Sequence, residues 1–349
     1  MEAKGKTRRA LVTGISGQDG AYLAKHLLEK GYEVFGGRRR SATQNLWRLD
    51  ELGIADRVQI VDLELLEYSN ILDAIRSIAP DEVYNLASQS DVAVSFKQPI
   101  FTSEVSGLGA LRILDVIRAI DPSIRFYQAS TSEMFGIAAE TPQSETTSFH
   151  PQSPYGTAKV FGHLASGNYR EAYGIYAACG ILFNHESPLR GVDFVTRKIT
   201  SGLAMIRAGL GKTIALGNLN AARDWGHAAD YVNGIWLMLQ QDQPEDFVLA
   251  TGQARTVRDF AKLAAQCADY DLEWSGKGIG EQAIDKQTGA VIFRVDEQYY
   301  RPAEISLLVG DASKAREKLK WHCQFSFEDM VLEMVRADID LLKRRGRIF

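Results

Sequence analysis

The chain has 349 residues, of which 45% are hydrophobic and 24% are charged. This composition is typical of a globular protein with one large or two modest domains. The 40 lysines and arginines and 44 aspartates and glutamates give a formal net charge of −4, which argues against a protein that binds nucleic acid along its phosphates. No window approaches about 18 consecutive apolar residues, so we expect no transmembrane helix and no membrane partner.

The first residues carry no pattern typical of an exported protein. The start of the chain is short and basic, and the apolar run 10–13 leads into glycines without the longer apolar segment of a signal peptide. Three cysteines, Cys179, Cys267 and Cys323, are an odd number without metal-ligand spacing. We therefore expect a cytoplasmic protein with reduced, mostly buried thiols and no metal.

The first half of the chain alternates strand-like and helix-like runs. After the apolar run 10–13, the segment 18–30 places Ala21, Ala24 and Leu27 on one helical face. Strand, helix and strand repeated in this way predict right-handed crossovers and a parallel sheet with helices on both faces, which is a doubly wound Rossmann-type α/β fold. The further strands are expected at 32–37, 58–62, 82–86 and 125–129, with helices at 65–78 and 107–120 between them.

The second half is less regular and predicts a smaller C-terminal substrate-binding domain. An apolar helix at 231–239 and a strand at 247–250 indicate that the chain leaves the sheet and returns to it. We expect a cofactor-binding domain of residues 1–183 and 224–252, and a substrate-binding domain of residues 184–223 and 253–349. The glycine-rich segment 276–289 is expected to be a mobile loop.

A dinucleotide site is expected directly after the first strand. Gly14, Gly17 and Gly20 have GxxGxxG spacing, and Gln18 and Asp19 open the helix that follows. Glycines at such a turn let a pyrophosphate approach the helix N-terminus, where free N–H groups and the helix dipole favour anions. The position between a strand and an amphipathic helix favours cofactor binding over an ordinary glycine-rich turn.

The end of the second strand indicates which cofactor is bound. An NAD enzyme usually has an acidic residue there, about 20 residues beyond the glycines, for the ribose 2′-hydroxyl. This chain has Arg38, Arg39, Arg40 and Ser41 instead, and guanidinium groups bind a 2′-phosphate, so NADP is favoured over NAD. Further contacts are expected after the third and fourth strands: Asp62 and Leu63 beside the adenine, and Leu86, Ser88 and Ser90 beside the nicotinamide ribose.

The candidate catalytic residues lie on the fifth strand and a later helix. Tyr155 and Lys159 are spaced i and i+4, so they share one helix face, and a neighbouring ammonium favours the phenolate form of the tyrosine. With Thr131 at the strand end, this set indicates an extended short-chain dehydrogenase/reductase. Glu133 adds a carboxylate, which suits removal of a proton next to a newly formed ketone.

Taken together, these motifs resemble the GDP-mannose 4,6-dehydratase family over nearly the whole chain. The segments Asn-His-Glu-Ser-Pro at 184–188 and Arg-Asp-Trp-Gly at 223–226 are specific to that group. The other matching segments are 14–20, 127–136, 153–159, 168–171, 194–198, 216–219 and 301–304.

The resemblance implies a role for each catalytic residue. Tyr155 would take the C4 hydroxyl proton of a GDP-sugar while hydride passes to NADP⁺, and Thr131 would orient that hydroxyl. Glu133 would then remove the C5 proton as water leaves C6, and the hydride would return to C6. Lys159 would hold the nicotinamide ribose, and either Ser132 or Glu133 would protonate the departing oxygen.

The resemblance also implies contacts in the second domain and between subunits. Asn184, Lys198, Arg223, Arg301 and Glu304 would bind the GDP-sugar, together with Ser90 and Glu133 of the first domain, while His185 and Arg190 would lie on the nicotinamide side of the cofactor. Arg39, Arg40 and Ser41 would also reach a neighbouring subunit of a homotetramer, with a dimer as the alternative. Simpler alternatives are surface ion pairs for Arg223 with Asp224 and for Arg301 with Glu304, and structural roles for His150, His163 and His227.

Three other functions are compatible with parts of this pattern. A GDP-manno-heptose dehydratase would keep every catalytic residue, and Ser88–Ser90, Phe101 and Ser103 are the positions that would distinguish its sugar. A reductase or epimerase would not need Glu133. A cofactor-binding regulator would need none of Thr131, Tyr155 and Lys159.

Overall fold

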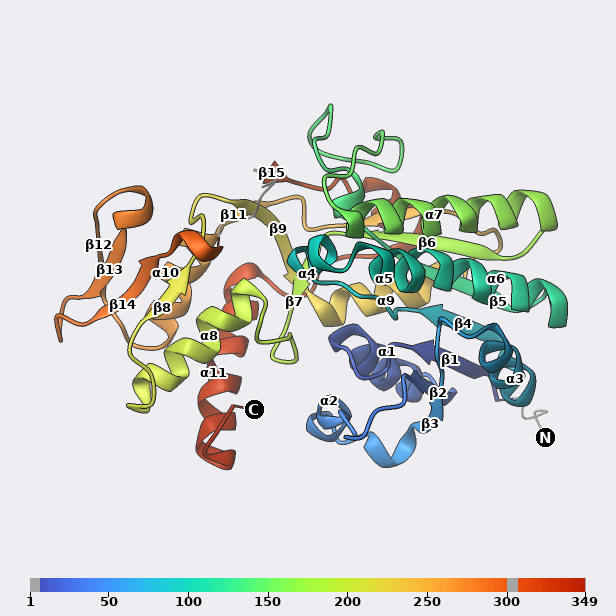
Figure 1. The fold of residues 1–349 in the computed structure, drawn as a ribbon, viewed down its shortest axis with the longest axis horizontal. Coiled ribbons are helices and arrows are strands. Elements are labelled where there is room, and N and C mark those ends of the chain that lie inside the picture. Colours follow the sequence, from blue (N-terminus) through green and yellow to red (C-terminus); the bar gives the residue numbers. More distant parts are fainter. Residues whose placement is uncertain (1–6, 300–306, 349) are drawn as a thin grey trace. The chain divides into compact units, whose positions relative to one another are not determined.

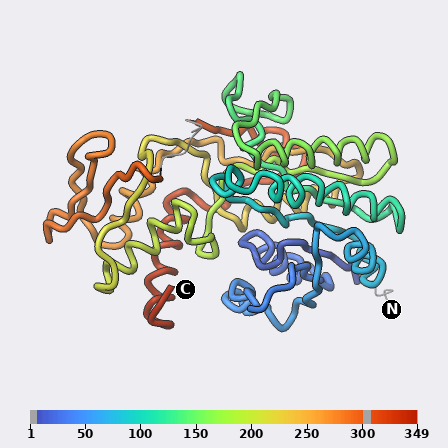
Figure 2. Tube along the Cα trace, in the orientation of Figure 1, coloured from blue at the N-terminus to red at the C-terminus, as the bar shows by residue number. Residues whose placement is uncertain are grey.

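The computed structural model describes residues 7–299 and 307–348. The chain forms two compact units, each assembled from separate segments. The first unit consists of Met1–Phe183, Ala228–Leu249 and Gly310–His322, and the second of Asn184–His227, Ala250–Val309 and Cys323–Phe349. The trace in Figure 2 follows the chain through these segments by colour.

The first unit contains the parallel sheet that the sequence predicts. Its seven strands are all paired in parallel, in the order β10-β6-β5-β4-β1-β2-β3 (Figure 1). The chain runs from β1 to β2 on one side and later to β4 on the other, so the strand order reverses between β1 and β4, where ligands of such sheets bind. The strands are β1 Arg9–Thr13, β2 Glu33–Arg38, β3 Gln59–Asp62, β4 Glu82–Asn85, β5 Arg125–Thr131, β6 Ala177–Leu182 and β10 Phe247–Leu249.

Helices cover this sheet in two groups, because α3 packs on α6 and α6 on α7, whereas α1 packs on α9. The predicted apolar face of α1 is confirmed, since Ala21, Ala24 and Leu27 are fully buried. Ile75 and Ile113 pack with the sheet residues of the α3–α6 side. The helices are α1 Gln18–Glu29, α2 Trp47–Glu51, α3 Tyr68–Ile78, α4 Val92–Lys97, α5 Pro99–Ser103, α6 Gly109–Ile120, α7 Pro154–Tyr173 and α9 Ala228–Met238, with short helical turns at Ala55–Arg57, Glu104–Leu108, Ser132–Met134 and Ala315–Leu319.

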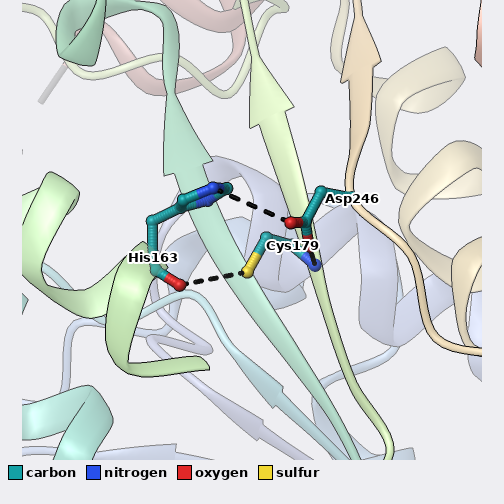
Figure 3. A group of neighbouring side chains, drawn as sticks. All are labelled: His163, Cys179 and Asp246. Carbon is teal, nitrogen blue, oxygen red and sulfur yellow. Dashed lines mark hydrogen bonds and ion pairs between the residues drawn. The ribbon is translucent and has the colours of Figure 1, made fainter. Parts of the chain in front are cut away.

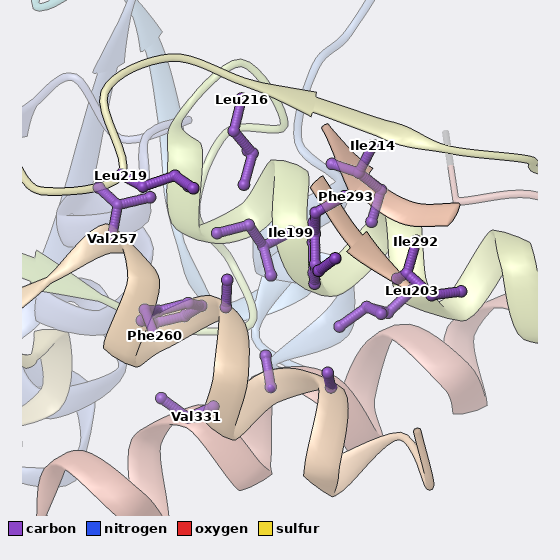
Figure 4. Close-up of a cluster of buried hydrophobic side chains, with 14 of the residues drawn as sticks. Ile199, Leu203, Ile214, Leu216, Leu219, Val257, Phe260, Ile292, Phe293 and Val331 are labelled. Atoms are coloured by element: carbon purple, nitrogen blue, oxygen red, sulfur yellow. The ribbon is translucent and has the colours of Figure 1, made fainter. Parts of the chain in front are cut away.

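The second unit has its own core between helices and small sheets. Figure 4 shows Ile199, Phe260, Phe293 and Val331 from four different elements meeting in this core. Its helices are α8 Val195–Arg207, α10 Val257–Cys267 and α11 Phe327–Arg345, with short turns at Gly278–Gly280 and Glu297–Tyr299. Its strands are β7 Asn184–Glu186, β8 Ile214–Leu216, β9 Ala222–His227, β11 Ala254–Thr256, β12 Leu272–Ser275, β13 Gln282–Asp285, β14 Val291–Val295 and β15 Leu307–Leu308.

The prediction of a mobile loop at 276–289 is wrong for much of that segment. Strand β13 lies inside it and pairs antiparallel with β12 and β14. Ala283 is fully buried in the core, and Asp285 accepts hydrogen bonds from the backbone and hydroxyl of Thr288 that close the turn. The glycines therefore mark the turns on either side of a strand.

The two units differ from the expected domains at three places. Residues 250–252, expected in the cofactor-binding domain, belong to the second unit. The end of β9, Asp224–His227, belongs to the second unit because β9 pairs with β7, β11 and β15. The segment Gly310–His322 belongs to the first unit, where the Trp321 indole donates to the backbone oxygen of Asp230 at 2.7 Å.

The cysteines are less buried than the sequence predicts. All three cysteines are free, but only Cys179 is buried, so the expectation of mostly buried thiols is wrong for Cys267 and Cys323.

His150 is exposed, whereas His227 is buried and lies 2.9 Å from Glu333. Within residues 7–299 and 307–348, no helix combines the length and hydrophobicity needed to cross a bilayer.

Candidate active site

The glycine turn after β1 is packed so closely that side chains are excluded from it. Gly14 has φ +71°, and a Cβ there would lie 2.8 Å from the backbone nitrogen of Ala87. A Cβ on Gly20 would lie 2.4 Å from the Gly14 carbonyl oxygen. Gly17 caps α1 without a side-chain hydrogen bond, so the first N–H groups of this 12-residue helix face the turn without a side-chain acceptor from their cap.

The end of β4 is tied to the same turn. Thr13 donates its hydroxyl to the Asn85 amide oxygen at 2.8 Å, and its oxygen accepts from the backbone N–H groups of Leu86 and Ala87. The Ser88 hydroxyl lies 2.8 Å from that of Ser106. The structure therefore brings Leu86, a predicted cofactor residue, to the glycine turn, and holds Ser88, another one, against Ser106.

The basic segment after β2 contains both paired and exposed arginines. Arg38 is paired with Asp62 across β2 and β3, with 3.8 Å between Nε and the carboxylate. Arg39, Arg40 and Ser41 are exposed. Leu63 is buried below this edge, where its side chain contacts Gly37.

Three of the predicted catalytic residues follow one another at the end of β5. Thr131 is the last residue of the strand, and its hydroxyl oxygen accepts from the backbone N–H of Glu133 at 3.3 Å. This cap starts the helical turn Ser132–Met134, in which Ser132 is buried and Glu133 is half-buried. The local sequence therefore presents a hydroxyl, a second hydroxyl and a carboxylate in a single turn.

Helix α7 places the tyrosine against that turn. Ser153 caps the helix by accepting from the Gly156 N–H, and Pro154 occupies its first position. A Cβ on Gly156 would lie 2.8 Å from the Glu133 carbonyl oxygen, so only glycine lets the two elements approach this closely. Tyr155, the residue before that glycine, is buried beside the Glu133 turn.

Lys159 lies one turn further along α7. Its Nζ donates to the Ala129 carbonyl oxygen at 2.8 Å and lies 5.8 Å from the centre of the Tyr155 ring. Burial lowers the pKa of Lys159 to about 8, and the nearby Asp19 carboxylate opposes this effect. A lysine with such a pKa still carries its charge at neutral pH and can favour the phenolate of Tyr155.

In the second unit, β7 carries two of the predicted residues and one that was missed. Asn184 and His185 pair with β9 opposite Trp225 and Gly226. Glu186 follows them and is 2% exposed.

Glu186 orients an arginine that the sequence predicts. The Thr196 hydroxyl donates to Glu186 at 2.6 Å, and the Nε of Arg190 lies 3.0 Å from the same oxygen. The Arg190 guanidinium also lies 3.7 Å from the centre of the Phe194 ring. No sequence signal indicated this role, because β7 consists of three polar residues and the burial of Glu186 appears only in the structure.

Four predicted residues of the second unit remain, and three of them are cations. The Nζ of Lys198 lies 3.2 Å from the centre of the Tyr299 ring. Arg223 is buried on β9. The alternative of a surface ion pair between Arg223 and Asp224 is wrong, because neither residue lies on the surface. Asp224 is fully buried and accepts hydrogen bonds from Thr251 and Gly252. Arg301 and Glu304 lie outside the described residues.

Two residues in the first unit also escaped the sequence reasoning. Arg48 of α2 donates to the Ser16 carbonyl oxygen at 2.8 Å and so joins the glycine turn. Ser106, in the π-helical stretch Glu104–Leu108, holds Ser88 and the Gln89 N–H. No motif marks either residue, because their partners are 17 to 32 residues away in the sequence.

Comparisons with known proteins agree with this arrangement. The sequence profile of the family described as GDP-mannose 4,6 dehydratase matches residues 11–334. The GDP-mannose 4,6-dehydratase of Yersinia enterocolitica is 49% identical, over 97% of this chain and 96% of its own. The corresponding protein of Homo sapiens is 47% identical, over 97% and 94%.

Solved structures show the same fold at lower identity. DesIV, a dTDP-glucose 4,6-dehydratase from Streptomyces venezuelae with NAD bound, has a TM-score of 0.81 at 21% identity, covering 97% of this chain and 98% of its own. The UDP-glucose 4-epimerase of Thermotoga maritima has a TM-score of 0.81 at 22% identity, covering 96% and 99%. With the profile match and the curated relatives, the chain belongs to the GDP-mannose 4,6-dehydratase family.

Proposed function

We propose that this protein removes water from GDP-mannose to give GDP-4-keto-6-deoxymannose, using NADP as a cofactor that is restored in each cycle. The observation that carries the proposal is the packing of Gly156 on the Glu133 carbonyl, which brings the carboxylate-bearing turn next to Tyr155. A reductase or an epimerase would require the tyrosine and the lysine, but not a carboxylate at this position.

The glycine turn fits a dinucleotide. A Cβ on Gly14 or Gly20 would collide with backbone atoms, so the turn is tight, and the N-terminus of α1 faces it. When bound, the nicotinamide supplies a reversible hydride acceptor, so that the hydride lost from C4 of the sugar is returned to C6. The exposed Arg39 and Arg40 and the absence of an acidic residue at the end of β2 support NADP rather than NAD.

Oxidation at C4 requires a base for the hydroxyl proton. Tyr155 accepts this proton as the C4–H bond breaks, and the Lys159 charge stabilises the phenolate before the transfer. Thr131 binds the same hydroxyl and orients it. Lys159 is fixed for this task by its hydrogen bond to Ala129.

Elimination requires a second base and an acid. The C4 ketone acidifies the C5 proton, and Glu133 removes it while the C6–O bond breaks. The C6 oxygen leaves as water after protonation by Ser132 or by Glu133 itself. A proton returns to C5 as C6 is reduced, so the two protons taken up by Tyr155 and Glu133 balance the two delivered to the C6 oxygen and to C5. The sugar loses one water, and no net redox change occurs.

The nucleotide part of the substrate is assigned to the second unit. Asn184, Lys198 and Arg223 carry the amide and the positive charges that a diphosphate requires. Arg301 is assigned to the same diphosphate, and Glu304 to the ribose of GDP. His185 and Arg190 are assigned to the cofactor, with Glu186 holding the Arg190 guanidinium in place.

The decisive experiment is mass spectrometry of the purified protein with NADP⁺ and either GDP-mannose or GDP-manno-heptose. Loss of one water from GDP-mannose, without accumulation of NADPH, supports the proposal. Dehydration of the heptose alone would keep the mechanism and change the substrate. Net consumption of NADPH would favour a reductase, and cofactor binding without turnover would favour a regulator.

The same proposal includes a homo-oligomer, tetramer or dimer, in the cytoplasm. Four apolar side chains on α4, α5 and α7 are exposed, namely Phe96 at 39%, Ile100 at 77%, Phe161 at 45% and Leu164 at 59%. Helices α4 and α5 both contact α7, and we assign these four side chains to the surface that a second copy would cover. Light scattering of the wild type and of a Phe161→Glu/Leu164→Glu variant would test this assignment.

A further inference from the structure

Helix α7 carries a row of polar side chains behind the catalytic pair. His163 and Arg170 follow Tyr155 and Lys159 at spacings that keep all four on one face of the helix. His163 is 8% exposed, and the Arg170 side chain is 20% exposed. The row faces β5 and β6, which α7 contacts along its length.

Two members of this row hold consecutive residues of β5. Lys159 donates to the Ala129 carbonyl oxygen at 2.8 Å, and His163 Nδ1 lies 3.0 Å from the Ser130 hydroxyl. The next residue of the strand is Thr131. The two contacts therefore fix the strand against α7 immediately before the catalytic turn begins.

The other nitrogen of His163 faces a carboxylate, as Figure 3 shows. His163 Nε2 lies 3.8 Å from Asp246. Arg170 binds both oxygens of Asp246, at 2.9 and 3.0 Å, and the Cys179 N–H donates to it at 3.1 Å. Burial raises the pKa of Asp246, but the hydrogen bonds and charge of Arg170 more than offset this and lower it.

This surrounding selects one form of the imidazole. Burial lowers the pKa of His163, which keeps the ring neutral at pH 7. The Asp246 carboxylate favours the tautomer with hydrogen on Nε2, which leaves Nδ1 as an acceptor. In that tautomer the Ser130 hydroxyl would donate to Nδ1, which would fix the orientation of the hydroxyl.

The same three side chains, His163, Cys179 and Asp246, have donor atoms within 4.8 Å of one another. A metal ion does not suit them, because Arg170 already occupies both oxygens of the carboxylate. Burial also raises the pKa of the Cys179 thiol well above its ordinary value, which disfavours the thiolate that a metal needs. The group is better described as an electrostatic support for the imidazole, in which Asp246 faces Nε2 and is itself held by Arg170 and the Cys179 N–H.

We propose that His163 is a positioning residue for the dehydration: through Ser130 it sets the end of β5, and hence Thr131, relative to Tyr155 on the same helix as His163. The proposal rests on the function proposed above. Catalytic groups lose efficiency steeply when they are displaced, by a factor on the order of 100 for about 1 Å. Loss of the Ser130 contact should therefore lower kcat more than it changes KM, because the nucleotide is held elsewhere.

The test uses two substitutions that separate the two nitrogens of the imidazole. In His163→Asn the amide oxygen takes the place of Nδ1 and can still accept from Ser130. In His163→Gln the amide reaches the position of Nε2 near Asp246, and the acceptor for Ser130 is lost. Ser130→Ala removes the donor. His26→Gln, at a half-buried histidine packed on Trp236, is the matched control.

We expect kcat for GDP-mannose to fall about tenfold in His163→Gln and in Ser130→Ala, with KM within about twofold of wild type. The His163→Asn variant and the His26→Gln control should keep kcat within about threefold of wild type. The kcat of the double variant Ser130→Ala/His163→Gln should be no lower than that of either single variant. Equal losses in the Asn and Gln variants, multiplicative losses in the double variant, or losses that appear only in KM would overturn the proposal.

A second readout does not depend on catalysis. Long-range ¹H–¹⁵N spectra of histidine-labelled protein, assigned with His163→Asn, should show a neutral ring with hydrogen on Nε2. The Nδ1 shift should change in Ser130→Ala. Hydrogen on Nδ1 would overturn the inference. A wild-type protein that dehydrates neither sugar would overturn the proposed function and the positioning role of His163 in it. The tautomer would still decide whether the contact between His163 and Ser130 exists.

Discussion

Replacing Lys159 by methionine should make the protein more stable and nearly inactive. The Lys159 side chain is 3% exposed, and burial lowers its pKa from 10.5 to about 8. A pKa lowered by that amount means that the charged lysine destabilises the folded protein by about 3 kcal/mol at pH 7. The unfolded chain, in which the lysine is in water, has no such penalty. Methionine has a similar shape and removes the buried charge.

The hydrogen bond that the substitution removes offsets little of this gain. The Ala129 carbonyl oxygen that binds Lys159 also accepts from the Gln128 amide at 3.1 Å. It therefore keeps a partner in the variant, and no buried acceptor is left unsatisfied. Activity should fall about 100-fold or more, because Tyr155 loses the neighbouring charge that favours its phenolate.

The pH dependence identifies the cause. The folded pKa lies below the unfolded one, so the unfolded chain binds more protons between pH 8 and 10.5 and wild-type stability rises with pH in that window. The free energy of unfolding that Lys159→Met gains over wild type should therefore fall from about 3 kcal/mol at pH 7 to about 1.5 kcal/mol at pH 9.5.

The assay is urea unfolding of the cofactor-stripped protein at both pH values. Lys97→Met, at an exposed lysine at the end of α4, is the control and should change stability by less than about 0.5 kcal/mol at either pH. A Lys159→Met protein that is less stable than wild type, or more stable by the same amount at both pH values, would refute the reasoning.

Three further predictions follow from the site and the core. Glu133→Gln should lower dehydration at least about 100-fold, since it removes the base for C5; solvent deuterium incorporation at C5, followed by mass spectrometry, should fall with it, and full turnover would contradict the assignment. Arg39→Ala/Arg40→Ala should raise KM for NADP about tenfold or more while KM for NAD changes little; steady-state kinetics with both cofactors checks this, and equal effects would remove the 2′-phosphate role. Asp338→Ala should destabilise the protein by about 3–5 kcal/mol in urea unfolding, because it leaves the buried Arg197 guanidinium, which lies 2.6 Å from Asp338, without its counter-charge. A change below about 1 kcal/mol would mean that the stability of the second unit does not depend on this pair.

The sequence predicted the parts of the fold that depend on local order. The alternation of apolar runs and helical periods was enough for the parallel sheet of the first unit, because each crossover connects neighbouring segments. The glycine spacing and the i, i+4 pair Tyr155 and Lys159 predicted where two groups of candidate residues lie on that sheet. Strand β13 was missed because its flanking glycines dominate the local pattern, whereas Ala283 is buried by residues far from it in sequence.

The supporting contacts could not be predicted, because each joins distant parts of the chain. Ser130 and His163 are 33 residues apart, and Arg197 and Asp338 are 141 apart. His163 was predicted to have only a structural role, since it belongs to no motif. Its position one turn beyond Lys159 places it on the catalytic face, but only the packing of α7 on β5 shows which residue it contacts.

The discontinuous first unit has a consequence for biosynthesis. All six residues of β6 are buried, and the strand that covers its outer edge, β10, is made about 65 residues later. At about 5–20 residues per second, a ribosome leaves that edge unpaired for roughly 3–13 seconds while the intervening chain emerges. During this interval the nascent chain presents an apolar strand with free backbone groups, so chaperone binding and aggregation of stalled chains should concentrate at β6. A fragment that ends before Phe247 would keep this open edge permanently.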